Sequence, residues 1–146
     1  FPSNQLVGVF NLELQRLYGY LYQQTNKNYS IVHALDGYDE ISLTGHTKVI
    51  SNTSETIFSP PDLGLKQLEQ NAIYGGNSVK DSAEIFLNVI EGNGTEAQNN
   101  VVCANAGLEV ATSKQIDHKE GFEIAKDSLL SGKAKTALFK LIELSK

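Results

Sequence analysis

Residues 5–34 have the sequence QLVGVFNLELQRLYGYLYQQTNKNYSIVHA, whose apolar pattern changes twice. The apolar run 5–10 ends at Asn11, a residue type that favours the N-cap of a helix. Beyond it, apolar residues recur with the spacing of a helix that buries one face, at Leu14, Leu17, Tyr18, Leu21 and Tyr22. A second β-rich run occupies 29–34. A strand, a helix and a strand in this order predict a βαβ unit with parallel strands.

The residues after this unit predict short strands. Three β-like runs lie at 40–43, 47–51 and 55–59, with turn-forming residues between them. The last two runs are separated by a short Asn-Thr-Ser segment, so we expect them to form a β-hairpin.

The second half of the chain has a helical pattern. Ser78 and Asp117 can cap two helices, and Thr95 with Gln98 has the spacing of a capping box for another. The helix after Ser78 carries apolar residues on one face, namely Val79, Ala83, Phe86, Leu87 and Ile90. The helix that contains Cys103 is apolar on nearly every side, so we expect it to be buried between other elements. A further helix extends to the end of the chain.

These elements predict one α/β domain. The chain has 146 residues, about the length of a single domain, and 40% of them are hydrophobic, which suits a folded soluble domain. We expect part of a mostly parallel sheet, a β-hairpin excursion and a helical C-terminal half.

The charge balance argues against two classes of partner. The sequence has 12 Lys and Arg against 17 Asp and Glu, a net charge of −5, and Arg16 is its one arginine. A nucleic-acid site needs clustered cations to contact phosphates, and a membrane-spanning helix needs about 20 apolar residues in a row. The sequence contains neither pattern, so we expect no nucleic-acid partner and no membrane span.

Two further features concern the origin of the chain. It contains no methionine, even at position 1, so we expect a processed chain or part of a longer protein. It has a single cysteine, which cannot form an intrachain disulfide, and its start lacks the pattern of a signal peptide. We therefore expect a cytoplasmic protein.

An acidic segment follows the second strand of the βαβ unit. Residues 36–40, DGYDE, contain three carboxylates and leave the carboxyl end of that strand, where doubly wound sheets carry their ligand sites. Neighbouring carboxylates repel one another, and Mg²⁺ relieves the repulsion by binding one or two of them together with substrate phosphates. The segment is compatible with a magnesium site. The alternative is a solvated acidic turn with ordinary Asp36-Gly37 turn chemistry.

Three other features have a structural interpretation beside a functional one. His33 ends the second strand and could contact a ligand, but a hydrogen-bonded core histidine is favoured. Gly75-Gly76 precedes a helix and could offer N–H groups to an anion, although such glycine pairs are common in turns. Cys103 lies among apolar residues, so we interpret it as a core residue. The irregular spacing of the histidines disfavours a zinc site.

Several segments together resemble the anthranilate phosphoribosyltransferase family. They are Gln5 to Phe10; Val32-His33-Ala34 followed by Asp36 to Ser42, Thr44-Gly45 and Thr47; Gly75-Gly76; Asn105-Ala106; Glu120-Gly121; and Ser131 to Ala134. The resemblance covers essentially the whole chain. It implies that residues 1–146 are the C-terminal portion of an α/β, nucleoside phosphorylase-like catalytic domain, without the N-terminal helical domain of the family.

The resemblance also implies a reaction. The family transfers the phosphoribosyl group of phosphoribosyl pyrophosphate to anthranilate, with release of pyrophosphate, in tryptophan biosynthesis. It implies that Asp39 and Glu40 hold Mg²⁺ against the pyrophosphate, where the metal stabilises developing negative charge. It implies no catalytic residue and no organic cofactor in this part of the chain. The implied partners are phosphoribosyl pyrophosphate and anthranilate, and the implied full-length protein is a homodimer.

Three motifs of the family do not occur in the sequence: a Gly-Thr-Gly-Gly-Asp phosphate loop, a Lys-His-Gly-Asn segment and the arginine that binds the anthranilate carboxylate. In the family they lie upstream of the position of Phe1, so we expect this chain alone to be inactive. Two other functions stay open, a pyrimidine nucleoside phosphorylase and a non-catalytic relative that binds nucleic acid. The isolated chain could also be a structural remnant that associates through an exposed sheet edge.

Overall fold

The structure, a computed structural model, describes residues 2–146 and confirms the α/β class. Its strands and α-helices are, in chain order, β1 (Asn4–Gly8), α1 (Leu12–Tyr22), β2 (Asn28–Ala34), β3 (Thr47–Ser51), β4 (Glu55–Phe58), α2 (Val79–Ile90), α3 (Glu96–Lys114), α4 (His118–Leu130) and α5 (Lys133–Leu144). Two short 3-10 helices, η1 (Pro60–Leu63) and η2 (Gln70–Ile73), lie between β4 and α2. The order of the strands and α-helices agrees with the sequence pattern, apart from the strand expected at 40–43, which is absent.

The strands form a mixed sheet in the order β1-β2-β3-β4. β1 and β2 are parallel, which confirms the predicted βαβ unit, and β3 and β4 form the predicted antiparallel hairpin. β2 and β3 are also antiparallel. The parallel character predicted for the sheet is thus limited, within residues 2–146, to the β1–β2 pair.

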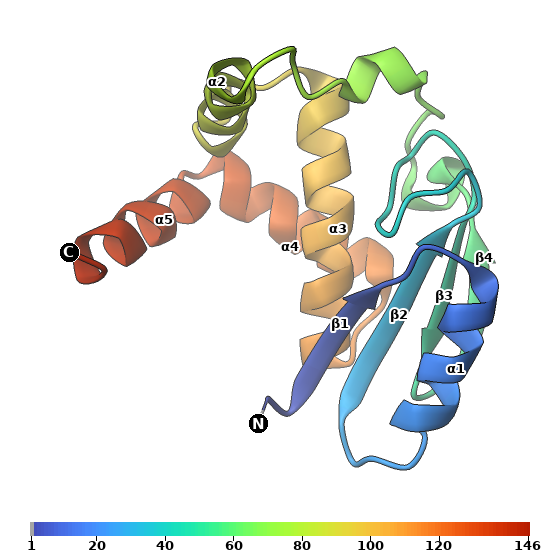
Figure 1. Cartoon of the computed structure of the whole chain (residues 1–146). Helices are drawn as coiled ribbons and strands as arrows, with labels where there is room; N and C mark the ends of the chain where they lie inside the picture. Colours follow the sequence, from blue (N-terminus) through green and yellow to red (C-terminus); the bar gives the residue numbers. More distant parts are fainter. Residues whose placement is uncertain (1) are drawn as a thin grey trace.

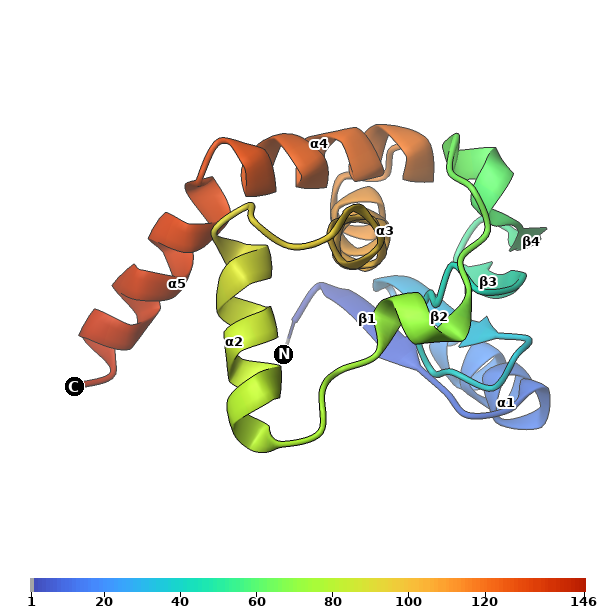
Figure 2. The ribbon, with the colours of Figure 1, turned by 90° about the horizontal axis from the view of Figure 1, so that it is seen from above.

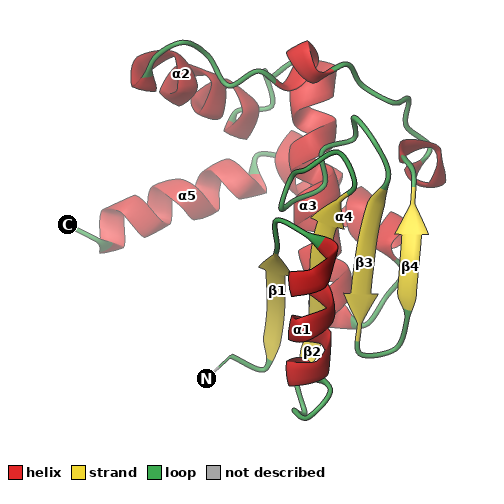
Figure 3. Cartoon of the chain, turned by 45° about the vertical axis from the view of Figure 1, so that its right-hand side comes forward, coloured by secondary structure: helices red, strands yellow, loops and turns green. Residues whose placement is uncertain are grey.

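Helices cover both faces of this sheet. α1 lies on one face and α3 on the other, and α4 packs on the outer side of α3 (Figures 1 and 2). α2 and α5 lie beside these layers, on the side of β1 (Figure 2). The connections that follow β1 and β2 meet at the same end of the sheet, because the two strands run in the same direction (Figure 3).

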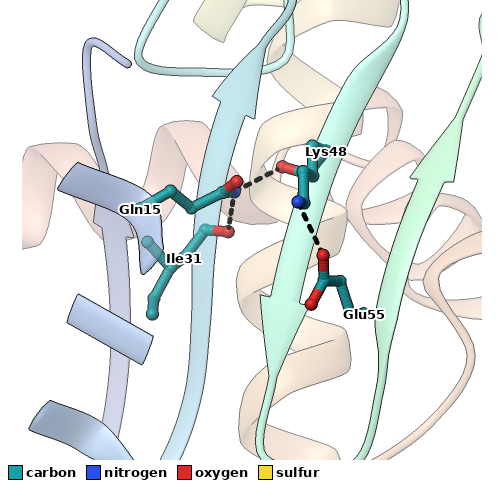
Figure 4. A network of polar contacts seen from close by, with 4 residues as sticks. All are labelled: Gln15, Ile31, Lys48 and Glu55. Carbon is teal, nitrogen blue, oxygen red and sulfur yellow. Dashed lines mark hydrogen bonds and ion pairs between the residues drawn. The ribbon is translucent and has the colours of Figure 1, made fainter. Parts of the chain in front are cut away.

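A buried glutamine attaches α1 to the sheet. Gln15 is fully buried, and its Nε2 donates to the carbonyl oxygens of Ile31 at 2.8 Å and Lys48 at 2.9 Å (Figure 4). Because these carbonyls belong to β2 and β3, one side chain joins the helix to two strands. Lys48 also forms an ion pair with Glu55 of β4 at 2.6 Å.

Two glycines allow α3 and α4 to cross closely. A Cβ atom at Gly107 would lie 2.6 Å from the backbone nitrogen of Phe122, and one at Gly121 would lie 2.2 Å from the carbonyl oxygen of Gly107. The close crossing buries Phe122, whose exposed fraction is 1%. It belongs to the main core between the sheet and these helices, together with Val32, Ile41, Leu43, Cys103, Leu108 and Leu129.

The strand predicted at 40–43 is absent, and this expectation was wrong. These residues belong to an irregular loop in which Leu43 has a positive φ of 58°. A left-handed residue is incompatible with an extended strand. Ile41 and Leu43 are nevertheless buried, so their apolar character reflects loop residues that insert into the core.

The apolar surfaces of α2 and α5 are largely exposed. On α2, Val79 is 89% exposed and Phe86 53%, while Val89 is buried. No residue of α5 is buried. The predicted helices are therefore confirmed, but most of the apolar face predicted for α2 does not lie in the core of this chain.

Candidate functional site

The acidic segment lies in the loop 35–46, which connects β2 to β3. The loop begins at the carboxyl end of β2, beside the end of β1 (Figure 3). Its base is closed by the N–H of Leu35, which donates to the carbonyl of His46 at 2.8 Å, and by the N–H of Ala34, which donates to Tyr38 at 2.9 Å. The segment with the three carboxylates therefore lies at the carboxyl end of β2, as the sequence pattern predicted.

One of the three carboxylates is used inside the loop. Asp36 accepts hydrogen bonds from the hydroxyl of Ser42 at 3.2 Å and from that of Thr44. The carbonyl of Thr44 accepts a further bond from Gln67 Nε2 at 2.7 Å. Asp36 therefore stabilises the shape of the loop.

The loop is anchored in the core by two apolar side chains and by an asparagine from α3. Ile41 is fully buried and Leu43 is 1% exposed. The side chain of Asn105 bonds to both backbone groups of Ile41: Oδ1 accepts from its N–H and Nδ2 donates to its carbonyl oxygen, each at 2.8 Å. The irregular backbone beside the acidic residues thus has partners in a helix distant in sequence.

A glycine of β1 allows the loop to approach the sheet. A Cβ atom at Gly8 would lie 1.9 Å from the carbonyl oxygen of Asp39 and 3.3 Å from its Cβ. Any side chain at this position would collide with the loop backbone. Gly8 and Asn105 are two positions whose contribution sequence reasoning missed; the available signals were a glycine inside an apolar strand and an amide inside an apolar helix.

Asp39 and Glu40 remain exposed beside this anchored backbone. Within residues 2–146, no hydrogen bond or ion pair involves either carboxylate. No group of three or more His, Cys, Asp or Glu side chains in the same residues could hold a metal ion by itself. Two adjacent carboxylates without partners do fit Mg²⁺, because this ion commonly takes one or two carboxylates and completes its shell with waters and substrate phosphates.

His33 and Cys103 are core residues, as the sequence predicted. His33 is 6% exposed, and its Nδ1 lies 2.9 Å from the carbonyl oxygen of Val9, which links β2 to the residue after β1. Cys103 is 2% exposed, and burial raises the pKa of its thiol. A raised pKa keeps the thiol protonated, so Cys103 is suited to packing and not to nucleophilic chemistry.

Part of the Gly75-Gly76 turn and of the α2 N-terminus is already bonded within the chain. The N–H of Asn77 donates to the carboxylate of Asp81 at 3.1 Å, and the N–H of Asp81 donates to the N-cap hydroxyl of Ser78 at 3.1 Å. The positive end of α2 is thus already next to a carboxylate of its own first turn. The turn interpretation of these glycines agrees with this geometry.

His118, to which the sequence gave no role, lines a groove at the other end of the sheet. The groove has a volume of about 550 Å³ and lies between the β3–β4 hairpin and the connection from α3 to α4. His118 Nε2 lies 3.0 Å from the carbonyl oxygen of Ala104, and the ring packs edge-on against Phe58. Burial lowers the pKa of His118, so the ring is neutral at pH 7 and donates from Nε2.

None of the helices in residues 2–146 has the length and apolar character needed to cross a bilayer.

Residues 1–135 match the family described as "Glycosyl transferase family, a/b domain". Among curated proteins, the chain is 60% identical over 145 residues to an anthranilate phosphoribosyltransferase of Flavobacterium johnsoniae and 61% identical over 145 residues to one of Christiangramia forsetii. Each alignment covers 99% of this chain and 44% of the relative. The chain therefore spans less than half the length of these relatives.

Solved structures share the fold. The anthranilate phosphoribosyltransferase of Saccharomyces cerevisiae in complex with PRPP and Mg superposes with a TM-score of 0.83 at 23% identity, over 97% of this chain and 41% of that one. The enzyme of Thermus thermophilus superposes with a TM-score of 0.81 at 24% identity, over 91% of this chain and 40% of that one. At this identity the similarity establishes the architecture of the chain.

Proposed function

The chain belongs to the glycosyl transferase family, a/b domain, and from this membership we propose that it is the C-terminal portion of the catalytic domain of an anthranilate phosphoribosyltransferase. The complete protein would transfer the phosphoribosyl group of phosphoribosyl pyrophosphate to anthranilate. Two relatives of that name, about 60% identical to this chain, support the assignment.

The observation that carries the proposal is the pair of unpartnered carboxylates, Asp39 and Glu40, at the carboxyl edge of β1 and β2. We propose that both bind Mg²⁺ and orient it toward the pyrophosphate of the substrate. When bound, the metal stabilises the negative charge that develops on the departing pyrophosphate. The carboxylates act by position and charge; neither needs to accept a proton.

The loop supplies this pair with a fixed backbone. Asp36 closes the loop through the Ser42 and Thr44 hydroxyls, while Gly8 leaves room for Asp39 against β1. Electrostatic stabilisation is most effective when the charged groups do not have to reorganise during the reaction. The anchored loop is therefore suited to hold a metal in one place.

We further propose that this chain alone is inactive. Its single arginine, Arg16, lies on α1 and not in the loop that carries the acidic pair. The phosphate-binding and anthranilate-binding groups would come from the remainder of the protein, since the relatives are more than twice as long as the aligned chain. We also propose that the complete protein is a homodimer, as the family resemblance implies, and that it is cytoplasmic, which the single buried cysteine favours.

The test is carried out with the complete protein that contains this chain. Replacing the pair together, Asp39→Asn with Glu40→Gln, should lower turnover of anthranilate by at least about 100-fold, because amides bind Mg²⁺ far more weakly than carboxylates. Removal of metal with a chelator should abolish the wild-type activity, and added Mg²⁺ should restore it.

A matched control replaces two exposed acids of α4, Glu123→Gln with Asp127→Asn, and should leave turnover unchanged. The proposal is contradicted if the doubly substituted acidic loop retains full activity. Phosphorolysis of a pyrimidine nucleoside without Mg²⁺ would indicate the phosphorylase function instead.

A further inference from the structure

We propose that Asn105 is a positioning residue for the Asp39–Glu40 pair, an inference that rests on the proposed function. Its carboxamide uses its oxygen and its NH₂ group in three hydrogen bonds. Oδ1 accepts from the N–H of Ile41 at 2.8 Å, and Nδ2 donates to the carbonyl oxygens of Ile41 at 2.8 Å and Val101 at 3.0 Å. A flipped amide would place its NH₂ group against the N–H of Ile41, so this arrangement is specific to one orientation.

The contact reaches the acidic pair through the backbone. The N–H of Ile41 belongs to the peptide that joins Glu40 to Ile41, and the carbonyl of Ile41 belongs to the next peptide. Asn105 therefore holds the peptide planes on both sides of Ile41. On the other side of the pair, the backbone of Asp39 lies against Gly8 of β1. The two acidic residues are thus confined between a contact from α3 and a contact from β1.

No backbone group replaces this contact. The other backbone hydrogen bonds of the loop join Ala34 to Tyr38, Gly37 to Ala34, Leu35 to His46 and Leu68 to Leu43. None of the backbone bonds in residues 2–146 involves Ile41. Ile41 is fully buried, so its polar backbone groups would have no water to bond if Asn105 were lost. The loop would then have to open to satisfy them, and Asp39 and Glu40 would move with it.

Asn105 differs from an ordinary core residue because its hydrogen bonds influence the position of two charged residues, Asp39 and Glu40. Two free carboxylates next to each other repel, and a loop that can move will separate them. A loop held at Ile41 restricts the backbone of both residues before the metal binds, so less ordering has to accompany binding. Substitution of a residue that orients metal ligands without contacting the metal commonly changes the metal affinity.

The experiment compares two Asn105 variants of the complete protein with a control from the same helix. Asn105→Ala removes the carboxamide, and Asn105→Leu removes its hydrogen bonds while filling a similar space. Asn99→Ala is the control, because Asn99 is also a partly buried asparagine of α3, but its Nδ2 donates to Gly94, outside the loop. Binding of Mn²⁺ in the presence of pyrophosphate is followed by the electron spin resonance of the free ion, without turnover. Hydrogen exchange over residues 39–43 reports the backbone.

Both Asn105 variants should bind Mn²⁺ roughly tenfold more weakly than the wild type, and Asn99→Ala should bind it normally. Amide exchange over residues 39–43 should accelerate only in the Asn105 variants. In the enzymatic assay, the Mg²⁺ concentration for half-maximal rate should rise by a similar factor. A variant that merely leaves part of the protein unfolded would lower the maximal rate at an unchanged Mg²⁺ requirement.

The outcomes separate the two proposals. If Asp39→Asn with Glu40→Gln abolishes Mn²⁺ binding while folded Asn105 variants bind it as Asn99→Ala does, the positioning role is overturned and the metal site stands. If the acidic double variant binds Mn²⁺ normally, the metal site itself is overturned. If Asn105→Ala does not fold, Asn105→Leu decides, because it avoids the cavity that the alanine would leave.

Discussion

The loop 35–46 and the turn at Gly75-Gly76 were both candidate ligand sites, and they differ in what their polar groups already contact. In the turn, the N–H groups of Asn77 and Asp81 donate to Asp81 and Ser78, within the first turn of α2. In the loop, Asp36 bonds to neighbouring hydroxyls, but Asp39 and Glu40 have no partner in residues 2–146.

The comparison shows that the carboxylates of the two segments differ in availability: Asp81 accepts a hydrogen bond from Asn77, whereas Asp39 and Glu40 accept none in residues 2–146. A polar group that is satisfied inside the chain has little to gain from a ligand, whereas adjacent unpaired carboxylates gain by binding a cation. The turn uses a carboxylate to complete a helix. The loop uses one carboxylate to build its own shape and leaves two exposed beside a backbone held by Gly8 and Asn105.

The largest difference in turnover between the two regions is expected when one glycine in each is replaced by alanine. Gly8→Ala would place Cβ 1.9 Å from the Asp39 carbonyl oxygen, while Gly76→Ala would place it 2.7 Å from Asp81 Cβ at a φ of 94°. Both should cost about 1–3 kcal/mol of unfolding free energy. Only Gly8→Ala should also lower turnover, by about 100-fold, because it displaces the acidic pair. Thermal unfolding and steady-state rates of the complete protein provide the measurements.

The experiment compares the loss of stability with the loss of turnover in the two glycine variants. If both variants lose turnover equally, the effect of Gly8→Ala cannot be attributed to displacement of the acidic pair. If the loop 35–46 is displaced in Gly8→Ala and the protein is still fully active, the proposed metal site is contradicted as well.

A smaller effect is expected when the carboxylate inside each segment is replaced. Asp36→Asn removes an acceptor from the Ser42 and Thr44 hydroxyls and should cost about 1–2 kcal/mol, with a severalfold higher Mg²⁺ requirement. Asp81→Asn weakens the interaction with the N-terminus of α2 and should cost about 0.3–1 kcal/mol, with an unchanged Mg²⁺ requirement. Chemical unfolding and Mg²⁺ titration of the rate measure both quantities. An unchanged Mg²⁺ requirement in Asp36→Asn would show that the hydroxyl contacts do not hold the pair.

The predictable parts of this molecule are those closed by contacts near in sequence. Asn11 caps α1 through the N–H of Leu14 at 2.8 Å, and Thr95 with Gln98 forms a complete capping box for α3. Such contacts span three residues, so the sequence pattern contains both partners. The place of the acidic segment 36–40 was predicted in the same way, because the order of strand and loop sets the end of the sheet at which it lies. The choice of Asp39 and Glu40 within it came from the family resemblance and stays a prediction.

The parts that were not predictable depend on distant partners. The backbone of Ile41 bonds to Asn105, 64 residues away, instead of joining a strand, so its β-like composition was misleading. The direction of Asp36 toward Ser42 and Thr44 and the close approach of Asp39 to Gly8 also require the folded chain. On α2, an apolar pattern predicted a helix correctly but could not show that Val79 and Phe86 are exposed in this chain.

His118 extends the comparison to a third region, where an internally bonded group should affect stability alone. Burial lowers its pKa from the ordinary value of 6.5, and the bond to Ala104 and the charge of Asp117 offset only part of this. Between pH 6.5 and the lower pKa of the folded chain, the unfolded chain holds a proton that the folded chain lacks. Stability therefore falls as the pH falls through this window.

Thermal unfolding of the complete protein at pH 7.5 and 5.5 should therefore show a decrease in the unfolding temperature at the lower pH. The decrease should be smaller in His118→Gln, which keeps a donor for Ala104 without titrating. His46→Gln, at an exposed position, is the control and should retain the wild-type decrease. This is the smallest of the three effects, and Mn²⁺ binding should be the same in all of these proteins. If His118→Gln keeps the wild-type pH dependence, the buried ring does not contribute to the loss of stability at low pH.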